Sequence, residues 1–77
     1  MELKIKQDEI KIGDNIRRVR KSKKCGQMEL VRILQLQGID ITRETFVKIE
    51  RGIQHIKATQ LKAIRDALNT TYDELLK

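Results

Sequence analysis

The sequence predicts an all-α domain, a compact bundle of five short helices. Three observations support this fold class. The 77 residues are rich in helix formers and include no Pro and only four Gly. Apolar residues recur at spacings of three or four, as on one face of a helix. Gly or Thr separates these segments, as expected where helices begin and end. A chain of this length is enough for one domain.

The hydrophobic spacing predicts two helices in the N-terminal half of the chain. Ile12, Ile16 and Val19 predict a first helix over residues 12–24. Gly26 can serve as the N-cap of a second helix over residues 27–37. Gly38 then stops this helix, because Gly is common just past a helix end. The inward residues of the second helix are Leu30, Val31 and Leu34.

Three more helices are predicted in the C-terminal half. Thr42 is the N-cap of the third helix, and Glu44 in its first turn suits the helix dipole. A fourth helix is predicted over residues 58–68. The segment TYDE from Thr71 is a capping box that begins a short last helix. The expected buried residues of these helices are Phe46, Ile49 and Ile53, then Leu61, Ile64 and Leu68, then Leu75 and Leu76.

The charge favours a polyanionic partner. The formal net charge is +6, and residues 16–24 carry six of the 17 basic residues and no acidic one. The alternative for such a run is a solvated helix face. With one Tyr, one Phe and no Trp, the chain lacks the aromatic residues that stack on single-stranded nucleic acids.

Other function classes lack the residues they need. One Cys cannot form an internal disulfide, and one Cys with one His cannot supply the usual four zinc ligands. With one Ser and no acid–base set, we expect no enzyme, no metal and no cofactor. No apolar run is long enough for a signal peptide or a membrane span, so we expect a cytoplasmic protein.

Four blocks in order carry a family resemblance: IGDNIRRVRKSKK, QMELVRIL, ITRETFVKIERG and QLKAIRDALNTTYDELL. Together they resemble the lambda-repressor-like helix-turn-helix DNA-binding family, of the Cro and xenobiotic-response-element type. The resemblance spans Ile12 to Leu76. It implies that the second and third helices form a helix-turn-helix, and that the third, about residues 43–51, enters the major groove.

The chain departs from the family pattern at four places. Lys24 and Gly26 stand where the family usually has Gly and Ser or Thr, and Val31 replaces a smaller Ala. The connection from Leu36 to Ile41 is longer than the usual turn. Cys25 stands at a position of a core Leu, where we expect it to pack as a small apolar side chain. His55 lies in a loop, with a loop or phosphate contact as its expected role.

The third helix carries the predicted base-reading residues. On a helical wheel, Glu44, Val47, Lys48 and Arg51 point outward. The resemblance implies that Arg43, Glu44, Val47 and Lys48 contact bases. Arg43 can bond guanine and Glu44 the cytosine amino group, although Glu44 can equally serve only the helix N-terminus. Val47 is either a contact to a thymine methyl group or an ordinary exposed valine.

Phosphate contacts and one ion pair complete the predicted site. The resemblance makes Gln27 a phosphate-binding residue, at the start of the second helix. It also pairs Glu50 with Arg20 of the first helix, with an unpaired surface Glu50 as the alternative. Some of the basic candidates will be ordinary solvent-facing residues. The further phosphate candidates are Thr42, Lys48, Arg51, Arg17, Lys21, Lys23 and Lys24.

The N-terminal residues 1–11 are predicted as an arm or a short strand, and residues 12–77 as the helix-turn-helix domain. Leu3 and Ile5 alternate with Lys4 and Lys6. This segment could pair with a partner chain, lie along DNA, or fray.

The sequence leaves two functions open. The first is a transcriptional regulator, expected to be a repressor, which binds a double-stranded operator with an inverted repeat as a homodimer. The candidate dimer surfaces are the fourth helix, the fifth helix and the N-terminal segment. The second is a protein-interaction or antitoxin-type module on the same scaffold.

Overall fold

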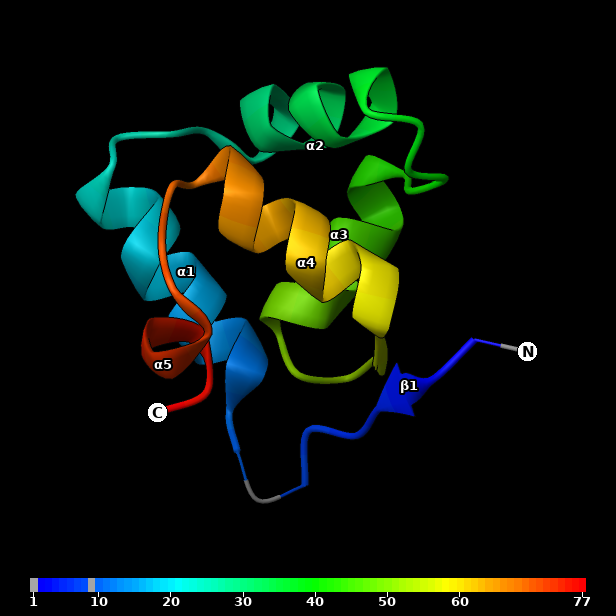
Figure 1. Ribbon diagram of the computed structural model, residues 1–77, viewed down its shortest axis with the longest axis vertical. Coiled ribbons are helices and arrows are strands. Elements are labelled where there is room, and N and C mark those ends of the chain that lie inside the picture. The colour runs from blue at the N-terminus through cyan, green and yellow to red at the C-terminus, as the bar shows by residue number, and fades with distance from the viewer. Residues whose placement is uncertain (1, 9) are drawn as a thin grey trace.

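The computed structural model describes residues 2–8 and 10–77, in which five helices surround one core and a two-stranded sheet lies at one side. Figure 1 shows α2 across the top, α3 behind α4 in the centre, and α5 against α1. The predicted helical architecture is therefore confirmed, with a small sheet added. The elements are β1 (Lys4–Ile5), α1 (Ile12–Ser22), α2 (Gln27–Leu36), α3 (Arg43–Glu50), β2 (Ile56–Lys57), α4 (Ala58–Ala67) and α5 (Tyr72–Leu75).

The core is made by one apolar face from each helix. Phe46 of α3 is its largest fully buried side chain. All the predicted inward residues of α1, α2 and α4 are buried, because their spacing of three or four places them on one face. The remaining fully buried large side chains are Ile12, Ile16, Leu30, Leu34, Ile49, Ile56, Ile64, Leu75 and Val31.

The N-terminal segment forms a strand within its own chain. β1 pairs antiparallel with β2, with Lys4 opposite Lys57 and Ile5 opposite Ile56. Ile5 packs against the core, whereas Leu3 stays exposed. Of the sequence-based alternatives for residues 1–11, the structure has the short strand; Met1 and Glu9 lie outside the described residues.

Helices α1 to α4 end in the same way. In each case the second residue after the helix has a positive φ. The backbone N–H groups of this residue and of the next one donate hydrogen bonds to carbonyls in the last turn of the helix. Gly38 and Gly52 occupy this position after α2 and α3, with φ of 85° and 76°. After α1 it is Lys24, with φ of 56°. The expected end of the first helix near residue 24 was therefore wrong, and α1 ends at Ser22.

Two predicted core residues lie at the surface. The side chain of Ile53 is 62% exposed, because α3 ends at Glu50 and Gly52 reverses the chain before Ile53 can continue the helical face. Leu76 follows the last turn of α5 and is 37% exposed, while Leu75 is buried. Cys25, the expected core filler, is only partly buried against the core.

Helices α1 and α3 approach each other closely at Gly13. A Cβ atom at this position would overlap the carbonyl oxygen of Ile49 and would lie 2.7 Å from that of Glu50. Both atoms belong to the backbone of α3, so no side-chain adjustment could relieve the overlap. Glycine at this position therefore determines how near α1 lies to the end of α3.

Candidate nucleic-acid interface

Helix α3 presents a polar face to solvent. The Thr42 hydroxyl accepts a hydrogen bond from the Thr45 amide at 3.1 Å, which caps the helix as predicted. Arg43, Glu44 and Lys48 are exposed, and Val47 is half-buried. Lys48 Nζ lies 3.6 Å from a Glu44 carboxylate oxygen, one helical turn away. Because both side chains are solvated, this pair is weak and can open for other partners.

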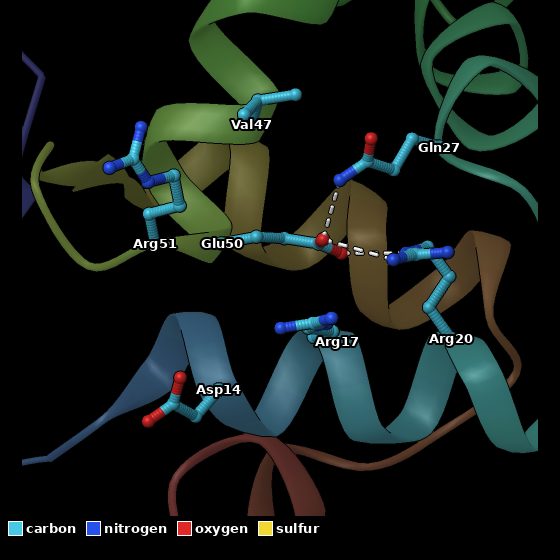
Figure 2. Close-up of a pocket in the computed structure, with 7 residues that line it drawn as sticks. All are labelled: Asp14, Arg17, Arg20, Gln27, Val47, Glu50 and Arg51. Atoms are coloured by element: carbon cyan, nitrogen blue, oxygen red, sulfur yellow. Dashed lines mark hydrogen bonds and ion pairs between the residues drawn. The ribbon is translucent and has the colours of Figure 1, made fainter.

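An open pocket lies beside α3, where α1, α2 and α3 converge. Its volume is about 650 Å³. Figure 2 shows that its side chains come from α1 below, from α3 and the residue after it above, and from the start of α2. Four of the predicted DNA contacts line this pocket, although three separate segments supply them: Arg17 from α1, Gln27 from α2, and Val47 and Arg51 from α3 and its C-terminal end. The full lining is Asp14, Arg17, Arg20, Gln27, Val47, Glu50 and Arg51.

A buried ion pair forms the floor of this pocket. The guanidinium of Arg20 donates to both carboxylate oxygens of Glu50, from Nε at 2.7 Å and from Nη2 at 3.1 Å. Arg20 Nη1 also donates to the Cys25 carbonyl at 2.8 Å. The carboxylate is thus held from two sides, because the Gln27 amide donates to it as well, at 2.9 Å.

This network uses only one of the two amide hydrogens of Gln27, the one directed to Glu50. The other can reach an acceptor in the pocket. Gln27 also begins α2, where backbone N–H groups have no partner within the helix. The predicted phosphate-binding residue is therefore held in place by an acidic residue of α3.

The mouth of the pocket carries a net positive charge. Arg17 and Arg51 are exposed, and among the described residues neither forms an ion pair. Asp14 is the acidic residue beside them, and Glu50 is already neutralised by Arg20. Two guanidinium groups against one free carboxylate favour an anionic ligand here.

The other predicted phosphate contacts lie away from this pocket. Lys21, Lys23 and Lys24 are exposed at the C-terminal end of α1 and do not line it. Lys24 is also part of the turn that ends the helix. The six basic residues of this run are thus divided. Arg17 and Arg20 line the pocket, Arg18 lies near Glu74 of α5, and the three lysines lie at the periphery.

Sequence reasoning did not single out three residues around the site, namely Gln7, Gly13 and Asp14. The signal for Gly13 was present, because a glycine inside a helical pattern often marks a close packing contact. Gln7 and Asp14 gave no such signal. Their roles depend on distant parts of the chain that the fold brings near.

Within the described residues, no group of three or more His, Cys, Asp and Glu side chains could hold a metal ion. Burial, with a smaller effect of nearby Glu29, raises the pKa of the Cys25 thiol above its usual value, which makes it less reactive. Within the same residues, no helix is long and apolar enough to cross a membrane.

Comparisons with protein-family models, with curated proteins and with solved structures found no match to this chain. The case for a function therefore depends on the chain's own residues.

Proposed function

We propose that this chain is a sequence-specific double-stranded DNA-binding protein, a transcriptional regulator that acts as a repressor. In this proposal α2 and α3 form a helix-turn-helix, and α3 lies in the major groove. The observation that carries the proposal is the pocket beside α3. Arg17, Gln27 and Arg51 all line this pocket, next to the exposed α3 side chains.

The arrangement matches the two kinds of contact that sequence-specific binding needs. Phosphate contacts position a protein on the duplex, and contacts to base edges carry the specificity. The open pocket offers two guanidinium groups and an amide for a backbone phosphate. Arg43, Glu44, Val47 and Lys48 of α3 would then face base edges, because an α-helix fits the major groove.

Dimerisation is the second part of the proposal. One domain of this size contacts few bases, so a homodimer on an inverted repeat would supply the missing affinity and specificity. The half-sites would lie about one helical turn apart, roughly 34 Å. Sedimentation of the protein with a duplex selected from a random pool measures the stoichiometry. Tight and specific binding of one monomer to a single half-site would contradict the dimer.

The decisive test separates base readers from phosphate contacts. A duplex is first selected from random DNA by the wild-type chain, and binding to it and to a scrambled duplex is then titrated with salt. Arg43→Ala should lose about 1–3 kcal/mol of binding free energy on the selected duplex and little on the scrambled one. Arg17→Ala should weaken both equally and lower the salt slope by about one unit.

Two outcomes would count against the proposal. Equal losses for Arg43→Ala on both duplexes would make Arg43 a phosphate contact and leave the reading to Glu44, Val47 and Lys48. If the wild-type chain binds duplex DNA without salt dependence, or does not bind it, the DNA-binding proposal fails. A protein-interaction module would then be the better hypothesis.

A further inference from the structure

The side chain of Gln7 connects three parts of the fold. Gln7 lies between β1 and α1 and is half-buried. Its amide nitrogen donates to the carbonyl oxygens of Ile49 and Gln54, both at 3.0 Å. Its amide oxygen accepts from the backbone N–H of Gly13 at 2.6 Å. All three bonds are side chain to backbone, so they hold the path of the chain rather than another side chain.

At α1, Gln7 acts as a cap from outside the helix. The residue at the N-cap position, Lys11, makes no side-chain capping bond. The N–H of Gly13 belongs to the first turn, where amides have no intrahelical partner. Gln7 supplies that partner from five residues before the helix. The start of α1 therefore depends on the N-terminal segment.

At α3, the same side chain binds the end of the proposed recognition helix. The Ile49 carbonyl accepts from Gln7 and also from the Gly52 amide, at 3.0 Å. Gln54 lies in the loop that leads to β2, so Gln7 holds both the last turn of α3 and the segment after it. Figure 1 shows the N-terminal segment passing below the lower end of α3 on its way to α1.

Gln7 thus spans the place where α1 and α3 approach each other closely, at Gly13. Gly13 permits this approach, since a Cβ atom there would overlap the backbone of α3. The Gln7 hydrogen bonds hold the two helices together at the same point. The spacing matters for the site, because Arg17 lies one turn further along α1 and Arg51 directly follows α3.

We propose that Gln7 is a specificity-determining positioning residue, which sets the distance between the phosphate-contacting face of α1 and the base-reading face of α3. This inference rests on the proposed DNA-binding function. Non-specific binding needs only the positive charge, which tolerates a displaced helix. Specific binding needs the phosphate contacts and the base contacts at the same time, so an altered spacing weakens it selectively.

The test changes the carboxamide while keeping the length of the side chain. Gln7→Met removes all three hydrogen bonds, and Gln7→Glu removes only the two donated ones. Gln37→Met and Gln37→Glu are matched controls, because Gln37 is exposed at the end of α2 and forms none of the Gln7 bonds. Circular dichroism establishes that each variant is folded at the temperature used. If the Met variant does not fold, Gln7→Glu carries the same comparison against Gln37→Glu.

The readout is affinity for the duplex selected by the wild-type chain and for a scrambled duplex of equal length. We expect Gln7→Met to lose about tenfold or more on the selected duplex and less than about twofold on the scrambled one, at an unchanged salt slope. Gln7→Glu should show the same preferential loss beyond the charge effect measured with Gln37→Glu.

Equal losses on both duplexes, or no loss, would overturn the role of Gln7 while leaving the DNA-binding proposal intact. Failure of the wild-type chain to bind either duplex would overturn both. The wild-type titration therefore distinguishes the two failures.

Discussion

Breaking the ion pair between Arg20 and Glu50 should strongly destabilise the fold. Arg20 is 7% exposed and Glu50 is 4% exposed, so neither charge can recover its hydration if the other is lost. Glu50→Gln leaves one amide oxygen where two carboxylate oxygens accepted from Arg20, and it turns an NH₂ group toward other donors. Removing one partner of a buried pair costs about 3–5 kcal/mol. A domain of this size has only about 4–12 kcal/mol of total stability.

Urea denaturation followed by circular dichroism measures this loss in the free energy of unfolding. Each kcal/mol lowers Tm by about 4–8 °C in a small domain. Arg20→Met combined with Glu50→Met should be less destabilised than Glu50→Gln, because the double variant leaves no buried charge unpaired.

Glu74→Gln provides the surface comparison. Glu74 lies 3.8 Å from Arg18 and 3.0 Å from Lys77. All three side chains are 40% or more exposed, so this change should cost less than about 1 kcal/mol. If Glu50→Gln costs no more than Glu74→Gln, the pair contributes as a surface pair does and the reasoning from burial is refuted.

Three further predictions concern the backbone and the N-terminal segment. Gly13→Ala should lower the free energy of unfolding by about 1–3 kcal/mol, because the added methyl group would overlap the Ile49 carbonyl; urea denaturation measures this loss. Unchanged stability would show that α1 and α3 can move apart at no cost. Lys24→Gly should raise the free energy of unfolding by about 1 kcal/mol in the same assay, because the φ of 56° at this position strains a residue that has a Cβ atom. A loss of stability would show that Lys24 is not strained. Hydrogen bonding by Thr59, from its side chain first and then from its amide at 2.7 Å, lowers the pKa of the Glu2 carboxyl below its ordinary 4.5. Because the folded state thus binds the proton less tightly, the contact is fully stabilising above pH 4.5 and is lost as the pH falls through the lowered pKa. The protection factor of the Thr59 amide against hydrogen exchange should fall in that acid range, and Glu2→Gln should remove this pH dependence of the protection factor.

Much of the helical architecture could be predicted from local pattern. The inward residues of α1, α2 and α4 repeat at helical spacing, and Gly38 marks the end of α2. Ile53 shows where this reasoning fails. Its spacing from Ile49 fits a helix, but the intervening Gly52 adopts a positive φ and ends the helical path. At Lys24 the reasoning fails in another way. Lysine has no preference for turns, so the pattern continued the helix to this residue, but Lys24 takes the left-handed conformation that ends it.

The sequence by itself determined which segments are helical, which faces are apolar, and where basic charge is concentrated, because these depend on neighbours within one or two turns. Only the tertiary structure decided which basic residues share a site: Arg17 joins Gln27 and Arg51 at the pocket, while Lys23 lies elsewhere. The role of Gln7 was also beyond the sequence, since its partners Ile49 and Gln54 are 42 and 47 residues away. Contacts at such separations follow from how the helices pack. Local spacing carries no information about that packing.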